Sequence, residues 1–288
     1  MGAERSPVTV GLLHPGRMGA AVGRLAARAG HRVLWCPDGR SAASAARAEE
    51  AGLVRADGLG ALIAEAEIVV SLCPPAVAEE VARQVAGAGF GGVFVEANAI
   101  RPARVRRIAG LFPRADVVDG CVIGPPPSGR TGARLYLSGA AGHTGPVAGL
   151  FAGDGPIEAI TIDGGIGQAS ALKMAYGSFN KAASALAAVS LALADTYGVS
   201  DHLLVEARRL AHDHLAAPEH LSRVAARAWR WAPEMEEAAA TMEEAGLPGE
   251  SARGAAAVFR RWDGDRDDFD IALPDALRHL RTDRDPEA

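Results

Sequence analysis

The sequence predicts an α/β fold: a doubly wound, Rossmann-type N-terminal domain followed by an all-α C-terminal domain with a long interdomain helix. Short apolar runs alternate with Ala-rich helical stretches up to about residue 162, which is typical of βαβ units in a parallel sheet. A stretch without proline, residues 167–197, then opens a half that is helical throughout. We therefore expect a doubly wound domain over residues 1–163 and a helical domain over residues 164–288.

Seven short apolar runs are expected to form the strands of the sheet. They are Val8–Leu13, Val33–Cys36, Ile68–Cys73, Val93–Glu96, Val117–Val122, Arg134–Ser138 and Ile157–Ile162. The amphipathic stretches between the first five predict helices at Met18–Ala29, Ser41–Ala51, Val77–Ala86 and Ala103–Leu111. In the second half we expect one helix of about 45 Å. It covers Gly167–Tyr197, and breaks follow at Pro218, Pro233 and Leu247–Gly249.

Charge and hydropathy exclude two classes of partner. The net charge is −5, and no Lys/Arg cluster is long enough for a nucleic-acid surface. No apolar run reaches the length of about 18 residues that a membrane span requires. The first residues lack the charged and apolar segments of a signal peptide. We therefore expect a cytoplasmic protein that acts on a small molecule.

Cysteine and histidine spacing argues against a metal site. Cys36, Cys73 and Cys121 are odd in number and lack paired ligand spacing, so reduced thiols are expected. The histidines that cluster in the second half lack the HxxxH and HExxH forms that bring two ligands to one helix face. They are His202, His212, His214 and His220. The sequence predicts no metal.

A glycine-containing turn follows the first expected strand and precedes the first expected helix. Its residues are His14, Pro15, Gly16, Arg17, Met18 and Gly19. This is the context of a dinucleotide fingerprint, in which Gly16 lets the backbone approach a pyrophosphate and Gly19 lets the helix pack on the strand. His14 occupies the place of the first glycine, so a purely structural turn is the alternative.

The segment after the second expected strand should select the cofactor. An acid there accepts from the ribose 2′-hydroxyl of NAD, whereas an arginine pairs with the 2′-phosphate of NADP. Arg40 and Ser41 together offer a bidentate donor and a hydroxyl, which favours NADP, with NAD as the alternative. Asp38 could also be a simple turn former.

At four stretches the sequence resembles the β-hydroxyacid dehydrogenase superfamily, which includes 6-phosphogluconate dehydrogenase and the imine reductases. It is most similar to a branch with its own C-terminal domain of unknown function. The four stretches are Leu13–Gly19 (LHPGRMG), Asp119–Pro127 (DGCVIGPPP), Ala169–Ser178 (ASALKMAYGS) and Ala228–Pro248 (AWRWAPEMEEAAATMEEAGLP). The resemblance covers nearly the whole chain and implies the two-domain fold and a nicotinamide cofactor.

The resemblance also implies roles for individual residues. Lys173 matches the lysine that these enzymes use as general acid/base on the interdomain helix. Cys73, Pro74 and Asn98 are expected to bind the cofactor, together with the glycine turn, Arg40 and Ser41. The expected substrate contacts are Asn98, Ile123, Gly124, Tyr176, Gly177, Trp231 and Met235.

This chain departs from the hydroxyacid enzymes of that superfamily in its substrate-binding residues. Ile123 stands where they carry a carboxylate-binding serine, Gly177 where they carry an asparagine, and Glu234 in place of an aspartate. These departures argue against a small hydroxyacid substrate. The apolar and aromatic residues among the expected substrate contacts would suit a bulkier substrate or an imine.

Three functions follow from these observations. The first is an NAD(P)-dependent dehydrogenase or reductase that acts on a small carbonyl or alcohol, with Lys173 as general acid/base. The second is an imine reductase or reductive aminase, and the third is a dinucleotide-binding protein without activity. Because the 167–197 helix is apolar over much of its circumference, we expect a homodimer with intertwined C-terminal helices.

Overall fold

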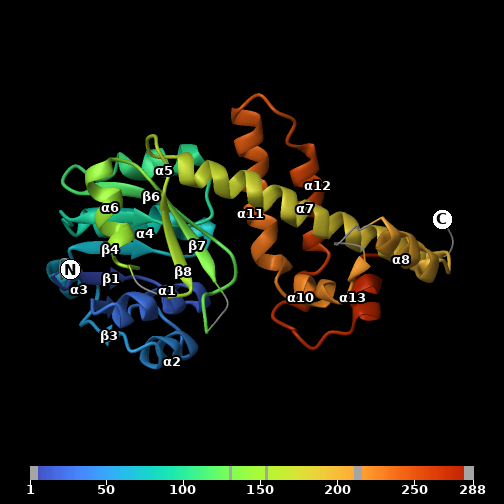
Figure 1. Cartoon of the computed structure of the whole chain (residues 1–288), viewed down its shortest axis with the longest axis horizontal. Helices are drawn as coiled ribbons and strands as arrows, with labels where there is room; N and C mark the ends of the chain where they lie inside the picture. The colour runs from blue at the N-terminus through green and yellow to red at the C-terminus, as the bar shows by residue number, and fades with distance from the viewer. Residues whose placement is uncertain (1–5, 130–131, 153–154, 211–215, 282–288) are drawn as a thin grey trace. The chain divides into compact units, whose positions relative to one another are not determined.

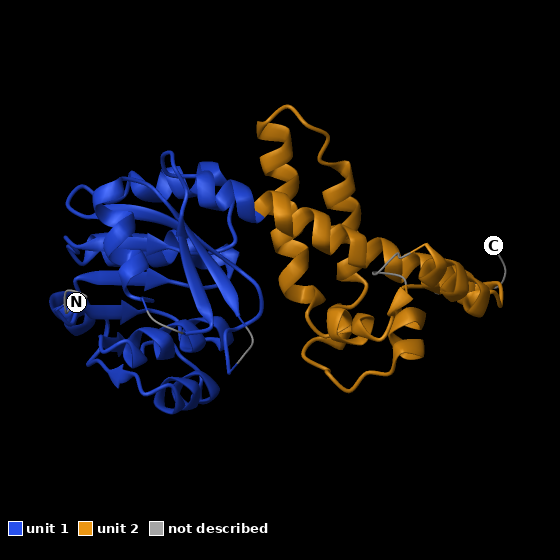
Figure 2. Ribbon diagram, in the orientation of Figure 1, with its two compact units in different colours: residues 1–173 blue, residues 174–288 orange. Residues whose placement is uncertain are grey.

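The structure is a computed structural model that describes residues 6–129, 132–152, 155–210 and 216–281 (Figure 1). It divides into two compact units, unit 1 with residues 1–173 and unit 2 with residues 174–288 (Figure 2). The long helix α7 (Gln168–Thr196) runs through both. The domain boundary predicted between residues 163 and 164 lies just before this helix and stays a prediction.

One sheet of eight strands is seen among the described residues of unit 1. The strands are β1 (Thr9–Leu12), β2 (Arg32–Trp35), β3 (Val54–Arg55), β4 (Ile68–Ser71), β5 (Val93–Glu96), β6 (Asp116–Ile123), β7 (Ala133–Ser138) and β8 (Ile157–Thr161). Their order is β3-β2-β1-β4-β5-β6-β7-β8, and each neighbouring pair is parallel except β6 and β7. The chain winds outward from β1 in both directions, so the doubly wound prediction is confirmed.

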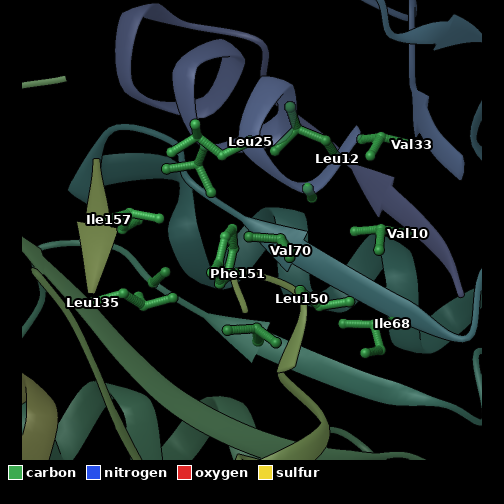
Figure 3. Packing of buried hydrophobic residues seen from close by; sticks show 14 of the residues in the cluster. Val10, Leu12, Leu25, Val33, Ile68, Val70, Leu135, Leu150, Phe151 and Ile157 are labelled. Carbon is green, nitrogen blue, oxygen red and sulfur yellow. The ribbon is translucent and has the colours of Figure 1, made fainter. Parts of the chain in front are cut away.

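Helices cover both faces of this sheet. They are α1 (Arg17–Arg28), α2 (Ala42–Glu50), α3 (Leu59–Glu65), α4 (Ala78–Gly87) with a preceding 3₁₀ turn η1 (Pro75–Val77), α5 (Pro102–Ala109) and α6 (Ala141–Gly149). One apolar cluster joins the sheet to α1, α2 and α6, and includes Val10, Leu12, Leu25, Phe151 and Ile157 (Figure 3). A second cluster joins the other face to α3, α4 and α5. The two clusters leave the carboxyl ends of the strands as the edge at which a ligand can bind.

The sequence did not predict β3, α3 or α6. Both side chains of β3 are exposed, so this two-residue strand has no apolar pattern. The helix α3 has only seven residues, and α6 contains Pro146 and several glycines, which lower helix propensity. Such short helices form because their apolar side chains become buried against the sheet. Their intrinsic helix propensity would not be enough.

Unit 2 is helical in all its described regular elements. After α7 they are α8 (Ser200–Arg209), α10 (His220–Ala225), α11 (Ala228–Glu244), α12 (Glu250–Arg260), a 3₁₀ turn η2 (Asp263–Asp265) and α13 (Leu273–His279). Phe259 of α12 packs edge-on against Trp231 of α11, and the Trp262 indole N–H donates to the Ala276 carbonyl at 2.7 Å. None of the helices in the described ranges is long and apolar enough to cross a membrane.

The predicted break at Pro233 is wrong, because this proline lies inside α11. A proline in a helix removes one N–H bond to the carbonyl four residues earlier, here that of Trp229. The position lies near the helix start, where Arg230 N donates to Arg227 O in a tighter three-residue turn. Two of the histidines discussed above, His212 and His214, lie outside the described residues.

Candidate active site

The glycine turn has the geometry that a pyrophosphate requires. A Cβ built on Gly16 would meet no atom within 4 Å, so the space beside this residue is open. A Cβ on Gly19 would lie 2.2 Å from the His14 carbonyl oxygen, so only glycine lets α1 approach the turn this closely. Gly16 is also the N-cap of α1 and supplies no capping side chain. The turn therefore fits an anionic ligand held at a helix N-terminus.

His14 is a neutral residue in this turn. Burial and, to a lesser degree, the charge of Arg40 lower its pKa to about 4. Its Nδ1 is buried and has no hydrogen-bond partner among the described residues. A neutral imidazole adds no charge of its own beside a bound phosphate.

Asp38 and Arg40 lie in the segment after β2 and make different contacts. Asp38 Oδ2 accepts from the Leu59 N–H at 3.0 Å, so this carboxylate caps the start of α3. Arg40 Nε donates to the Asp38 carbonyl at 2.9 Å, which is the only hydrogen bond of the Arg40 side chain to other described residues. Its two terminal nitrogens are thus available for an anion. The Ser41 hydroxyl accepts from Ser44 N and caps α2.

Both polar atoms of the Asn98 side chain are hydrogen-bonded within unit 1. Its side chain is 3% exposed, Oδ1 accepts from the Cys73 N–H, and Nδ2 donates to Ser71 Oγ at 3.0 Å. Cys73 and Pro74 follow directly after β4, and this bridge fixes their backbone. Burial is the main cause that raises the pKa of the Cys73 thiol to about 12. The structure thus brings Asn98 and Cys73 together, as a brace between β4 and β5.

Asp119 caps the start of α7. Its Oδ2 accepts from Gly167 N, Ser170 N and Ser138 Oγ at 2.9, 3.0 and 3.1 Å, and its Oδ1 accepts from Ser170 Oγ at 2.6 Å. Ser138 Oγ also accepts from Ala169 N at 3.1 Å. A side-chain carboxyl group that accepts hydrogen bonds from backbone N–H groups at a helix start stabilises that start, as a capping residue does. Burial nevertheless raises its pKa.

Lys173 lies on α7 one turn beyond this cap. Its Nζ donates to the Val122 carbonyl at 2.7 Å, near the end of β6. No described carboxylate lies within ion-pair distance of this amine. The second lysine of the chain, Lys181, instead pairs with Glu234. Lys173 is therefore the lysine whose amine is held by a neutral acceptor at the carboxyl edge of the sheet.

Ile123 and Gly124 follow Val122 at the end of β6. Gly124 has φ 121°, a left-handed conformation that favours glycine, and packs on Ala133. Ile123 lies in the wall of a cleft of about 860 Å³ between α6, β7 and β8. The two residues thus end the strand whose Val122 carbonyl binds Lys173.

The other predicted substrate residues belong to unit 2. Tyr176 is half exposed and its hydroxyl accepts from Asn180 Nδ2 at 3.4 Å, while Gly177 leaves room beside α7. Trp231 lies under the Lys181 amine, 5.7 Å from the ring centroid. Met235 is buried, so its side chain is part of the core of unit 2. The roles of these residues stay predictions.

Sequence reasoning missed three polar residues that shape the site, Glu96, Ser138 and Ser170. Each is 0% exposed. Glu96 ends an expected strand, and Ser138 ends another. A charged or hydroxyl side chain that closes a buried strand was the available signal, since such groups are rarely buried without a partner.

The comparisons with known proteins agree with this architecture. Residues 194–262 match a domain of unknown function, DUF1932. Curated protein sequences give no significant match. A conserved hypothetical protein from Sinorhizobium meliloti has a similar structure, with 25% identity, a TM-score of 0.68, and coverage of 96% of this chain and 97% of that one.

Two named enzymes have similar structures as well. The 3-hydroxyisobutyrate dehydrogenase of Mycobacterium tuberculosis is 18% identical, with a TM-score of 0.71 and coverage of 96% of this chain and 100% of that one. A reductive aminase from Aspergillus terreus, in complex with NADPH and ethyl levulinate, is 20% identical, with a TM-score of 0.55 and the same coverage. The fold implied by the sequence resemblance is therefore confirmed: the chain has a fold similar to those of these two enzymes, and a DUF1932 segment lies in its C-terminal half.

Proposed function

We propose that this protein is an NAD(P)-dependent oxidoreductase that transfers hydride between a nicotinamide cofactor and a small carbonyl or alcohol, with Lys173 as general acid/base. The observation that carries the proposal is the placement of Lys173. Its amine is held by the Val122 carbonyl at 2.7 Å, on a helix whose first turn Asp119 fixes to the same strand. The glycine turn lies at the same edge of the sheet, where doubly wound folds bind their ligands.

The cofactor we propose is NADP, with NAD as the alternative. The open space at Gly16 and the N-terminus of α1 would hold the pyrophosphate. Arg40 would pair with the 2′-phosphate, because its terminal nitrogens make no hydrogen bond to another described residue. The Ser41 hydroxyl would support it only by capping α2. When bound, the nicotinamide would supply or accept the hydride.

The role of Lys173 is proton transfer. In the reducing direction, its ammonium would donate a proton to the oxygen on which negative charge develops, and in the oxidising direction its amine would accept that proton. The hydrogen bond to Val122 O holds Nζ in one place without neutralising its charge. Positioning of this kind accounts for a large share of catalysis by a general acid.

The test is oxidation of NADPH and NADH against a panel of aldehydes, ketones and cyclic imines. Lys173→Met should bind the cofactor normally but lose turnover by about 10²–10⁴-fold. Lys181→Arg is the matched control, since it changes the other lysine and keeps the pair with Glu234. A Lys173→Met enzyme with undiminished kcat would refute the assignment, and Tyr176 would then be the next candidate donor.

A second candidate is an imine reductase or reductive aminase. Ile123 and Gly177 cannot supply the polar contacts that a substrate carboxylate needs, which favours a substrate without one. Turnover of cyclic imines, or of a ketone with an amine, would select this candidate. Tight NADPH binding without turnover of any substrate would favour the third candidate, a dinucleotide-binding protein, for which His14 is the motivating residue.

We also propose that the protein is a homodimer. Three large apolar side chains on α7 lie seven residues apart, and Phe179, Leu186 and Leu193 are 73%, 69% and 59% exposed. Val189 adds a further exposed apolar side chain between two of them. A seven-residue apolar repeat forms a continuous seam along one helix face, as in coiled coils. A second copy that covers this seam with its own helices would explain its composition.

A further inference from the structure

Four polar side chains form a row across the interior of the sheet. Ser71 of β4 pairs with Glu96 of β5, Glu96 pairs with Asp119 of β6, and Asp119 pairs with Ser138 of β7. Directly paired residues point to the same face of a sheet, so the four side chains are neighbours. All four are 0% exposed. Burial of polar groups costs free energy unless they are hydrogen-bonded, and each of these four side chains makes at least one hydrogen bond.

One end of the row reaches the loop after β4. Asn98 Nδ2 donates to Ser71 Oγ, and Asn98 Oδ1 accepts from the Cys73 N–H. The Asn98 N–H in turn donates to Glu96 Oε1 at 3.0 Å. Glu96 and Ser71 therefore fix Asn98 together, and Asn98 fixes the backbone of Cys73.

The other end of the row reaches α7. Asp119 and Ser138 together accept from three backbone N–H groups at the start of this helix, those of Gly167, Ala169 and Ser170. Lys173 lies one turn further, and its Nζ is bound by the carbonyl of Val122, three residues beyond Asp119 on β6. The row thus runs from the loop at Cys73 to the helix that carries Lys173.

Glu96 is the member of the row without a complete set of partners. Its Oε2 is buried and accepts no hydrogen bond from any described residue. The pKa of Glu96 is raised to about 8, mainly by burial and also by the charge of Asp119, although the Asn98 hydrogen bonds and Arg104 lower it. This raised pKa favours the protonated, uncharged form of Glu96 at neutral pH. Besides Asp119 and Arg104, the Cys73 thiol lies close enough for the charge of Glu96 to raise its pKa.

We propose that the row Ser71–Glu96–Asp119–Ser138 is a positioning device that holds the loop at Cys73 and the first turn of α7 in a fixed relationship, and so holds Lys173 in place relative to the cofactor. This inference rests on the proposed function. Glu96 is the central positioning residue of this row. It lies between Ser71, which binds Asn98, and Asp119, which caps α7. The device requires Glu96 to be neutral, because an ionised Glu96 would place two carboxylates side by side in the sheet.

The chain offers a readout that requires no substrate. It holds only two lysines, Lys173 and Lys181. Reductive methylation with ¹³C-formaldehyde labels both for NMR, and Lys181→Arg assigns the Lys173 signal. In the unmodified protein, the Lys173 signal should shift as pH passes through about 8, when Glu96 ionises, and NADPH affinity should fall about fivefold over the same range, the factor for one lost hydrogen bond.

Three variants define the expected result. Glu96→Gln is neutral at every pH, so the Lys173 shift near pH 8 and the fall in NADPH affinity should both be absent. Asp119→Asn should move the Lys173 signal already at neutral pH, and Ser138→Ala, a milder change at the same cap, should move it in the same direction. Asp116→Asn is the matched control, an exposed carboxylate on the same strand, and should change neither signal.

Two results would overturn the inference. One is a pH-dependent shift of the Lys173 signal in Glu96→Gln that equals that of the unmodified protein. The other is an unchanged Lys173 signal in both folded cap variants, with folding checked by circular dichroism. If the unmodified protein binds no NADPH, the proposed function fails, whereas the NMR titration still decides whether the row controls Lys173.

Discussion

Asp119 holds both polar groups of Ser170, the backbone N–H at 3.0 Å through Oδ2 and the hydroxyl at 2.6 Å through Oδ1. Both residues are 0% exposed. The pair therefore fastens the first turn of α7 to the middle of β6 in an environment where hydrogen bonds to a charged group are strong. Because a helix is stiff, this attachment also fixes the position of the Lys173 backbone, from which the side chain extends to the Val122 carbonyl.

Ser170→Ala tests this relationship. The variant leaves one acceptor position of the buried Asp119 unsatisfied, so the free energy of unfolding should fall by about 1–3 kcal/mol. Urea unfolding followed by circular dichroism measures it. Ser178→Ala is the matched control on the same helix, because among the described residues the Ser178 hydroxyl bonds only to the Ala175 carbonyl of that helix. Equal losses of unfolding free energy in the two variants would show that the hydrogen bond to Asp119 contributes no more to stability than the bond within the helix.

Arg40→Ala tests the cofactor assignment. We expect the unmodified protein to bind NADPH more tightly than NADH by about 1.5–3 kcal/mol, the value of a charge-assisted contact to the 2′-phosphate. The variant should lose most of that difference and keep its NADH affinity, as measured by isothermal titration. Arg32→Ala, at the other end of β2, is the control. Equal affinities for both cofactors in the unmodified protein would contradict the assignment.

The sequence predicted the order of the elements and most of the sheet, because buried parallel strands are apolar runs with a clear signal. It also predicted the turn at Gly16 and the position of Lys173, since each follows or lies on an element of that kind. It missed the cap of α3 by Asp38 and the role of Glu96. Both depend on residues that approach only in the folded chain, such as Leu59 beside Asp38 and Asp119 beside Glu96, and pairing across the sheet has no local signature.

Glu96→Gln should change how stability depends on pH. The pKa of Glu96 in the folded protein is raised from 4.5 to about 8, so the protonated acid stabilises the fold fully below about pH 4.5. That contribution is lost as pH rises through about 8. Between these limits, the free energy of unfolding of the unmodified protein should therefore fall by at most about 4–5 kcal/mol.

The variant should show a flatter curve over the same range, because a glutamine does not titrate. Thermal unfolding at a series of pH values measures both curves. Glu158→Gln is the control, an exposed glutamate on β8 that pairs with Arg134, and its curve should parallel that of the unmodified protein. A Glu96→Gln curve with the same slope would mean that Glu96 is already ionised in the folded protein.

The seam on α7 leads to a prediction about assembly. Phe179, Leu186 and Leu193 repeat at the seven-residue interval that keeps one helix face against a partner. An interface of the obligate kind buries more than about 2,000 Å². Light scattering at sub-micromolar concentration should therefore report about twice the 29.6 kDa mass of one chain.

Leu186→Glu places a charge in the middle of that seam and should convert the protein to a monomer, because an unpaired carboxylate cannot be buried there without a large cost. Glutamate is a good helix former, so α7 itself should persist, which circular dichroism would verify. Val54→Glu, an exposed apolar residue on β3, should leave the dimer intact. If each active site borrows side chains from the neighbouring chain, the Leu186→Glu monomer should also lose turnover while it keeps cofactor binding by unit 1. An unmodified protein that is a stable, active monomer would refute both the interface and the shared site.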